Sequence, residues 1–411
     1  MLTENEKIET LIRLSVELNQ LQDFDILMEH ILAEARNFVN ADAGSIYIRD
    51  GDRLIFSYTQ NETLQKRMPP GGKLVYSTFS IPVDETSIAG FSAATGKTLN
   101  ISDVWAIGNS RPYRFNKDFD EKACYRTRSV LTIPLKTLQG NVIGILQIIN
   151  ARDGNEKVIP FSTEDEKMML HFASTATVAL ERAQLVRNII LRTIKMTEMR
   201  DPKETGAHVN RVASCATEIY EKWARLKGIP ERQIDLNRDL LRMAAMLHDA
   251  GKVAIPDALL KKPGKLTDEE FKVMQSHTIQ GARIFMDRHS EFDVVAFDVS
   301  LNHHENWDGT GYPGHVDVAT GLPLQGKAGP DGLPLGKKGE EIPLFGRIVA
   351  IADVFDALTA RRSYKHAWGE SEALEAIEKA SGRQFDPELV GILFSCLDSI
   401  RQARQRYPDE V

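Results

Sequence analysis

One stretch of the sequence restricts the possible folds more than any other: between Thr163 and Pro202 there is no glycine or proline. Because these two residue types end or kink helices, the stretch predicts one helix of roughly 35 residues, about three times the mean length. Thr163 and Glu166 have the spacing of a capping box at its start. A helix of this length divides the chain, and the sequence has a different character on each side of it.

The part before this helix indicates helices and antiparallel strands. Residues 4–37 carry apolar side chains at helical spacing, in two segments of which Asp23 or Asp25 could cap the second. Strand-like runs follow at 45–49 and 54–58, and again at 129–138 and 142–149 around a Gln139-Gly140-Asn141 turn. Residues 60–128 are irregular apart from a short helix expected at 87–95. The pattern predicts an α+β domain over residues 1–162, with helices flanking an antiparallel sheet.

The part after the helix shows almost no strand signal and predicts an all-α domain over residues 201–411. The clearest helices are expected at 234–247, 268–286, 345–362 and 370–380. One stretch, residues 306–343, is instead rich in glycine and proline and contains a near-repeat, Gly321–Lys327 and Gly332–Lys338. A loop of that length inside a compact domain is usually functional or disordered.

Composition and charge exclude several classes of protein. Three cysteines without a CxxC pair are typical of a reduced, cytoplasmic protein, because disulfide frameworks need paired cysteines. No apolar run of about 18 residues occurs, so we expect no membrane span. The net charge of -7 argues against binding to a nucleic-acid polymer, which favours a basic surface.

The apolar residues of the long helix leave its role open between two interpretations. They recur three or four residues apart and are interrupted at Arg187, and they are Met169, Ala173, Ala176, Leu180, Ala183, Ile190 and Ile194. In one interpretation the helix packs on its own domain. In the other, residues 163–200 are a coiled-coil connector that joins two copies in a homodimer and transmits the state of the first domain.

Histidines and carboxylates recur inside apolar helices of the second half. His248-Asp249 ends one such helix, and a buried imidazole beside a buried carboxylate is costly unless both are paired or bound to metal. The others in this pattern are Glu204 and His208, four residues apart, then His277, the pair His303-His304, and Asp353. A single histidine would be read as an ordinary core or surface residue, as His289 and His366 are. The set, with nitrogen and oxygen ligands and no thiolate, favours Fe, Mn or Zn in a multinuclear site.

Two strings in this half match a known family. His248-Asp249-Ala-Gly-Lys252 and the run from His303 to Pro313, HHENWDGTGYP, resemble the HD-GYP phosphodiesterases, over about residues 195–400. The resemblance implies a helical domain that hydrolyses cyclic di-GMP, or a related cyclic dinucleotide, with two or three divalent metal ions. Fe or Mn is the expected metal. Such metals neutralise the charge of a phosphodiester and lower the pKa of a bound water.

The resemblance also implies roles for individual residues. The implied metal ligands are Glu204, His208, His248, Asp249, His277, His303, His304 and Asp353, with Asp249 bridging two metals and Glu204 holding a third. Asp249 and Lys252 are the implied catalytic residues, with Lys252 projecting from the same helix side as His248 toward the substrate phosphate. Arg362 and Lys365 would contact phosphate and guanine. In the GYP motif, Asp308, Gly309, Gly311, Tyr312 and Pro313, the glycines are also explained by a structural turn.

The chain departs from the family after this motif, because residues 316–338 separate it from the Ile342-Pro-Leu344 that usually follows closely. This insertion is interpreted either as a flap or partner-docking loop or as a passive surface insertion. Deleting residues 316–338 without any change in rate or substrate preference would exclude the flap.

The first half resembles a GAF domain over about residues 20–185. The matching strings are Ala43–Ile48, Ile81–Asp84 with Ile88–Gly96, and Ser129–Pro134 with Val142–Gly144. GAF domains often bind small molecules, so the resemblance implies a small-molecule ligand, whose identity stays unknown. A pattern associated with cyclic nucleotides is present in part: Asn150, Phe161, Asp165 and Glu166 match, but Ala151 replaces the lysine.

The expected function is therefore hydrolysis of cyclic di-GMP to pGpG and on to GMP, regulated by the GAF domain. One alternative changes the substrate to cyclic GMP-AMP or to linear pGpG. Another is a catalytically silent adaptor that binds the dinucleotide or a diguanylate cyclase. Silent members lose metal ligands, and none is missing here, which favours the enzyme.

Overall fold

The computed structural model describes residues 4–68, 79–201, 205–359 and 368–408. The chain divides into two compact units, Met1–Val186 and Arg187–Val411. Each unit is described by itself. Among the described residues, no helix combines the length and the apolar character that crossing a membrane requires.

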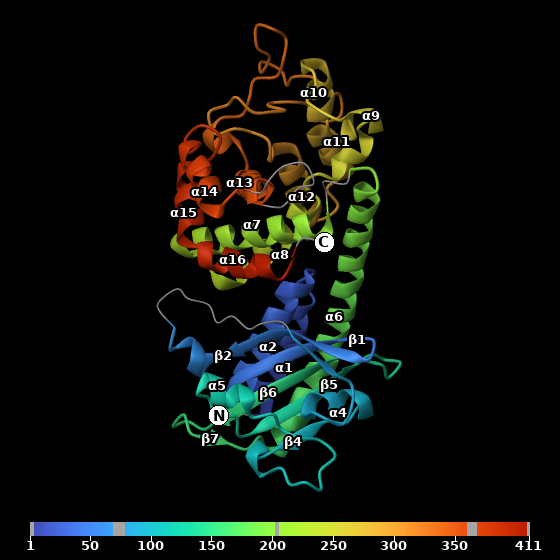
Figure 1. The fold of residues 1–411 in the computed structure, drawn as a ribbon, viewed down its shortest axis with the longest axis vertical. Coiled ribbons are helices and arrows are strands. Elements are labelled where there is room, and N and C mark those ends of the chain that lie inside the picture. The colour runs from blue at the N-terminus through green and yellow to red at the C-terminus, as the bar shows by residue number, and fades with distance from the viewer. Residues whose placement is uncertain (1–3, 69–78, 202–204, 360–367, 409–411) are drawn as a thin grey trace. The chain divides into compact units, whose positions relative to one another are not determined.

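Unit 1 is built from an antiparallel sheet with helices before, between and after its strands (Figure 1). Its helices are α1 (Glu4–Leu18), α2 (Phe24–Phe38), α3 (Glu62–Gln65), α4 (Ile88–Thr95), η1 (Val104–Ala106), α5 (Asp118–Ala123) and the first part of α6 (Thr163–Glu198). Its strands are β1 (Ala41–Asp50), β2 (Arg53–Asn61), β3 (Ser80–Pro82), β4 (Leu99–Ile101), β5 (Val130–Lys136), β6 (Val142–Arg152) and β7 (Val158–Ile159).

The sheet has the order β3-β2-β1-β6-β5-β4, with β7 paired to β6. All the pairs are antiparallel, as expected. The two predicted hairpins are present, and Gly51 and Gly140 take positive φ angles of 59° and 85° in their turns. Asp23 is the cap of α2, since its carboxylate accepts hydrogen bonds from the backbone N–H groups of Asp25 and Ile26. The predicted α+β class is confirmed.

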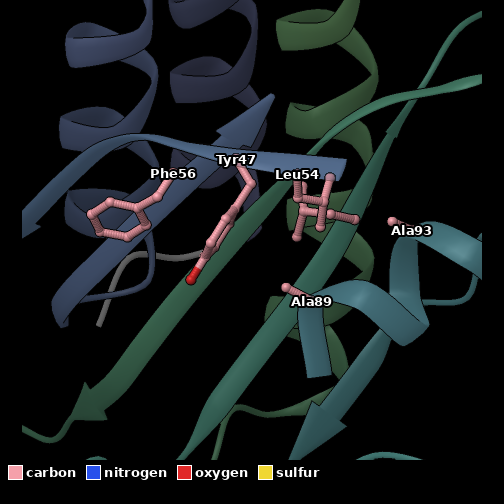
Figure 2. Packing of buried hydrophobic residues seen from close by; sticks show 6 residues of the cluster. Tyr47, Leu54, Phe56, Ala89 and Ala93 are labelled. Carbon is pink, nitrogen blue, oxygen red and sulfur yellow. The ribbon is translucent and has the colours of Figure 1, made fainter. Parts of the chain in front are cut away.

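The two faces of this sheet carry different helices. On one face α2 lies against β1 so closely that a Cβ on Gly44 would stand 2.8 Å from a methyl group of Leu32. On the other face α4 supplies Ala89 and Ala93 to a cluster with Tyr47, Leu54 and Phe56 of β1 and β2 (Figure 2). Small residues on α4 let that helix approach the aromatic rings, and Tyr47 and Phe56 meet edge to face at 5.3 Å.

The predicted long helix is present as α6, but its cap differs from expectation. The capping pair is Ser162 and Asp165: the hydroxyl of Ser162 accepts the N–H of Asp165, and the carboxylate of Asp165 accepts the N–H of Ser162. The pair lies one residue earlier than predicted because the helix begins at Thr163, which makes Ser162 the residue at the cap.

The apolar stripe of α6 is buried within the chain. Met169, Ala173, Ala176, Leu180 and Ala183 are all at most 2% exposed. Arg182 donates hydrogen bonds to the carbonyl groups of Asn19 and Leu21 at the end of α1, which shows that α6 lies against the N-terminal helices. These five side chains are covered by the chain's own residues, which favours the interpretation that this part of the helix packs on its own domain. The coiled-coil connector over residues 163–200 stays a prediction.

The described residues of unit 2 form helices joined by loops, with isolated bridges and no strand; the longest non-helical stretch runs from 303 to 338. Its elements after α6 are α7 (Gly206–Leu226), α8 (Glu231–Met246), η2 (Ala250–Ala254), α9 (Asp257–Leu260), α10 (Asp268–Gln275), α11 (His277–Ile284), α12 (Glu291–Asn302), η3 (Gly339–Glu341), α13 (Leu344–Thr359), α14 (Glu370–Lys379), α15 (Pro387–Ser395) and α16 (Leu397–Gln405). At the centre α7 packs against α8, α13 and α16. The predicted all-α class is confirmed.

One helix predicted in this unit is two. The expected helix at 268–286 breaks between α10 and α11 at Ser276. There the hydroxyl of Ser276 bonds to the carbonyl of Val273 at 2.6 Å, and the ring of His277 bonds to that of Met274 at 2.7 Å. Side chains that bond to the preceding turn compete with the helix ladder, which explains the break.

The insertion at 316–338 is folded back on itself. The N–H of His315 donates to the carbonyl of Leu335 at 2.8 Å, so the two arms of the insertion lie side by side. Val316 and Val318 at its start are buried against Ala282 and Leu301 of α11 and α12. The leucines of the near-repeat, Leu322, Leu324, Leu333 and Leu335, are exposed by 44–64%.

Candidate metal centre

The ends and turns of five helices bring the predicted ligands of unit 2 together. His208 lies in the first turn of α7, where its N–H donates to the cap Thr205 at 3.1 Å. His248 and Asp249 lie in the turn between α8 and η2 rather than inside a helix, because α8 ends at Met246. The others are His277 at the start of α11, His303 and His304 just after α12, and Asp353 within α13.

The ligand atoms form two groups. Asp249, His277, His303 and His304 make one group, and His208, His248 and Asp353 make the other; within each, the atoms lie within 4.8 Å of one another. Asp249 contacts both groups with different oxygens. Its Oδ1 lies 3.1 Å from Nε2 of His277, and its Oδ2 lies 3.3 Å from Nε2 of His248. Asp249 therefore stands where a carboxylate would have to stand to bridge two ions.

Hydrogen bonds on the far side of the rings fix which nitrogen faces the centre. Nδ1 of His248 lies 2.8 Å from the carbonyl of Ala245, and Nδ1 of His277 lies 2.7 Å from that of Met274. Nδ1 of His303 lies 3.1 Å from the carbonyls of Val299 and Ser300. A carbonyl can only accept, so Nδ1 carries the proton and the neutral ring presents a bare Nε2, the form that binds metal.

The bare nitrogens make the centre suited to cations. Nε2 of His277 lies 3.4 Å from Nε2 of His303 and 3.1 Å from Oδ1 of Asp249, so lone pairs face one another. Oδ1 of Asp249 is buried, and no described residue donates a hydrogen bond to it. Buried acceptors that face one another without a donor are unfavourable unless a cation lies between them. The residues present therefore fit divalent metal ions.

Burial and charge set the protonation states in the same direction. Burial lowers the pKa of His303 and, more strongly, that of His304, so both rings stay neutral. Burial acts to raise the pKa of Asp249, but nearby positive charge, first that of Lys252, holds the pKa well below the usual range of a carboxyl group. Neutral imidazoles beside an ionised carboxylate are the forms that ligate metals.

Lys252 lies at this centre. The sequence predicted that Lys252 projects from the same helix as His248. The structure places it on the 3₁₀ turn η2 instead. Its Nζ atom still lies 2.7 Å from Oδ2 of Asp249, and its side chain is 15% exposed. The structure thus places an ammonium group beside the carboxylate that contacts both ligand groups.

Sequence reasoning missed Asp356, which is 1% exposed. Its Oδ2 accepts from Nδ1 of His208 at 2.8 Å, and its Oδ1 accepts from Nε of Arg211 at 2.7 Å. The pKa of Asp356 is about 2: burial acts to raise it, and the bonds from His208 and Arg211 outweigh burial. Its position three residues after Asp353, on the same face of an apolar helix, was the available signal.

The GYP segment borders the centre. The ring of Tyr312 stacks on His304 with centroids 4.9 Å apart, and its N–H donates to the carbonyl of His304 at 3.1 Å. Gly309 has φ of 86°, and a Cβ on Gly311 would stand 2.2 Å from the backbone nitrogen of Asn306. Asp308 is turned to its own loop, where it accepts from the N–H and hydroxyl of Thr310. The glycines thus serve the turn, and Pro313 follows Tyr312 in it.

Three predicted site residues, Glu204, Arg362 and Lys365, lie outside the described residues. His366, expected on the surface, lies there too, whereas His289 has a side chain that is 84% exposed.

In unit 1, the residues of the partial cyclic-nucleotide pattern make contacts within the fold. The amide of Asn150 accepts the N–H of Arg128 at 2.7 Å and donates to the hydroxyl of Tyr125 at 2.9 Å. Asp165 caps α6, Glu166 accepts from Asn100 at 3.1 Å, and Phe161 is buried. These contacts explain the residues without a ligand.

Comparison with known proteins defines the class of each unit. Residues 205–358 match the family model of the HD domain, and residues 23–180 match that of the GAF domain. The chain thus carries a GAF domain followed by an HD domain, which confirms both resemblances.

Three curated relatives each match about half of the chain. A protein named 3'3'-cGAMP-specific phosphodiesterase 2, from Vibrio cholerae, is 40% identical over 50% of this chain and 34% of its own length. A protein named cyclic di-GMP phosphodiesterase, also from Vibrio cholerae, is 40% identical over 47% of this chain and 36% of its own length. The cyclic di-GMP phosphodiesterase response regulator RpfG of Xanthomonas campestris is 36% identical over 52% of each chain. The chain thus spans between a third and about half of the length of these relatives.

Proposed function

We propose that this chain is a metal-dependent phosphodiesterase that hydrolyses cyclic di-GMP. The observation that carries the proposal is Asp249, which directs one oxygen toward each of two groups of bare imidazole nitrogens. Divalent metals bound there would neutralise the phosphodiester and supply a hydroxide at neutral pH. Iron and manganese suit the nitrogen and oxygen ligands, and Glu204 is the proposed ligand of a third ion.

The chain's own residues have separate proposed roles around such a centre: some orient the metal ligands and others bind the substrate. Hydrogen bonds to Nδ1 orient the rings of His248, His277 and His303, which fixes the geometry before substrate arrives. Lys252 presents an ammonium group to the substrate phosphate. Arg362 and Lys365 are the proposed contacts to phosphate and guanine. The proposed first product is pGpG, which forms when one of the two phosphodiester bonds of cyclic di-GMP is hydrolysed. GMP follows when the phosphodiester bond that remains in pGpG is hydrolysed.

A second substrate is favoured by a specific observation. Relatives named for 3'3'-cGAMP and for cyclic di-GMP are equally similar to this chain, at 40% identity. Hydrolysis of cyclic GMP-AMP is therefore the alternative, followed by a silent adaptor that binds a dinucleotide or a diguanylate cyclase. The GAF domain is proposed to regulate the enzyme through a small-molecule ligand.

The test uses the full chain purified without oxygen. Metal content is measured first, and cyclic di-GMP and 3'3'-cGAMP are then supplied separately with Fe(II) or Mn(II), with products resolved by chromatography. We expect cyclic di-GMP to be consumed and Asp249→Ala to lose turnover together with at least one metal, because a bridging carboxylate is gone. Faster turnover of 3'3'-cGAMP would select the alternative substrate. Bound metal without any turnover would select the adaptor, and full activity of Asp249→Ala would refute the assignment of the site.

A further inference from the structure

The residues that follow α6 are fastened to the segment that carries Lys252. The guanidinium group of Arg200 donates to the carbonyl of Val253, to that of Ile255 at 2.9 Å, and to Oδ1 of Asp257 at 2.8 and 3.0 Å. One side chain thus holds both the end of η2 and the start of α9. All these residues belong to unit 2.

The next residue, Asp201, points to Lys252 itself. Asp201 is 4% exposed, and its Oδ2 lies 3.5 Å from Nζ of Lys252. The same ammonium lies 2.7 Å from Oδ2 of Asp249. Lys252 therefore stands between two buried carboxylates. One of them, Asp249, belongs to the metal-ligand groups, and the other, Asp201, lies three residues after the end of α6.

The two carboxylates have different tasks. Asp249 has oxygens in contact with histidine nitrogens of both groups, so its charge is shared with any ion bound there. Asp201 lies outside both groups. Its carboxylate stands beside the ammonium of Lys252 at the edge of the centre, and a nearby anion helps to keep a buried lysine charged and in place.

We propose that Asp201 is a positioning residue for Lys252, and that the segment just after α6 is in this way a part of the phosphodiesterase centre. The inference rests on the proposed function, because it takes Lys252 to meet the substrate phosphate. Since α6 is a single helix from Thr163 to Glu198, a rotation or shift of its last turn changes the position of Asp201 and Arg200. It thereby changes the position of the phosphate-binding ammonium group, so regulation can act on binding of the phosphate without displacing a metal ligand.

The first experiment is a double-mutant cycle between Asp201 and Lys252. Asp201→Asn keeps the shape and removes the charge, and we expect about a tenfold loss of kcat/KM, the size of one lost charge-assisted contact. In a Lys252→Met background the same change should cost less than about twofold. Asp201→Glu, which keeps the charge, should recover part of the loss. Asp287→Asn, whose side chain is 82% exposed, is the matched control and should leave the rate unchanged.

The cycle is repeated without turnover, so that it does not depend on the substrate. Binding of inorganic phosphate to the metal-loaded protein is measured by calorimetry for the same four proteins, with metal content determined for each. Weaker binding in Asp201→Asn at unchanged metal content, and no further weakening in the Lys252→Met background, supports the inference. Equal losses in both backgrounds would overturn it, because Asp201 would then act independently of Lys252. A protein that binds phosphate but hydrolyses neither dinucleotide would refute the proposed function alone.

A last comparison tests the fastening by Arg200. Hydrogen exchange is followed in peptides covering residues 250–260 of the full chain. Arg200→Gln should raise exchange in these peptides, because three backbone and side-chain anchors are lost, while Arg192→Gln on the exposed side of α6 should not. Unchanged exchange in Arg200→Gln would show that the segment is held without α6, which contradicts the proposed connection.

Discussion

At the scale of single residues, the metal centre depends on groups that touch the ligands from behind. His208 differs from His248, His277 and His303 in the hydrogen bond of its ring. Its Nδ1 donates to the carboxylate of Asp356, whereas theirs donate to backbone carbonyls. A carboxylate in this place raises the basicity of the ring and holds its orientation. Arg211 keeps that carboxylate ionised inside the protein.

Replacing Asp356 should therefore weaken the metal centre without removing a ligand. We expect Asp356→Asn to lower the affinity for the ion at His208, His248 and Asp353 by about 10- to 100-fold, the usual effect of losing such a partner. A competition with a chelator, followed by metal analysis, measures it. Asp398→Asn, with a side chain that is 88% exposed, is the control. Equal metal retention by Asp356→Asn and the wild type would show that the carboxylate serves only to pair Arg211.

The sequence named most of the residues that the structure brings together in the two groups, but it did not name Asp356, for a physical reason. His248-Asp249 and His303-His304 stand out because charged and imidazole groups are rare beside apolar runs. Asp356 becomes meaningful only when α13 packs against α7, a contact between residues almost 150 positions apart. Which nitrogen of each ring is free is likewise a property of the folded turn, so the pattern could name histidines but not their orientation.

At the scale of elements, helices and hairpins could be predicted from the sequence, but a break between two helices could not. The turns at Gly51 and Gly140 and the cap at Asp23 follow from local chemistry that is visible in the sequence. The break at Ser276 was missed because the apolar periodicity continues across it. A hydroxyl and an imidazole, bonded to the preceding turn, decide the geometry there.

The insertion at 316–338 is an element whose anchoring can be tested. Glu305 is 3% exposed, and its carboxylate accepts the N–H of Gly314 at 2.6 Å before the insertion and that of Lys337 at 3.4 Å near its end. We expect Glu305→Ala to open the base of the insertion and to speed tryptic cleavage after Lys327 by about tenfold or more, since each bond to an ionised group contributes about 1.5–3 kcal/mol.

The control for this experiment is Glu340→Ala, which removes an exposed carboxylate in the neighbouring turn η3. Its cleavage rate should match the wild type. If Glu305→Ala is also cleaved at the wild-type rate, then the contacts of Val316, Val318 and Arg283 hold the insertion by themselves. The insertion would then behave as a fixed surface element, which argues against the flap interpretation.

At the scale of the whole molecule, the open question is how two copies would associate. The stripe first expected to form a dimer seam is buried within the chain, so burial in the fold accounts for it. A second line of apolar side chains, on α6 and at the residue just after it, remains exposed by 43–75%: Leu170, Val178, Leu185, Ile189, Met196 and, after the helix, Met199. From Val178 onward the steps are seven, four, seven and three residues, which is close to the spacing of a two-stranded coiled coil. If two copies associate through this helix, we therefore expect the contact on its exposed apolar line and not on the buried stripe.

Charge introduced on this second line should separate the copies. We expect the full chain to be dimeric in light scattering after size exclusion, and the double variant Leu185→Lys with Ile189→Lys to be monomeric, because two lysines per helix cannot be buried against their own copies. Leu138→Lys is the matched control: Leu138 is 93% exposed on the β5–β6 turn and is not part of α6, and its replacement should leave the mass unchanged. A double variant that stays dimeric, with wild-type helix content by circular dichroism, would show that the copies associate through another surface. A wild type that is monomeric at every concentration measured would exclude the homodimer expected from the sequence, and regulation along α6 would then have to act within one chain.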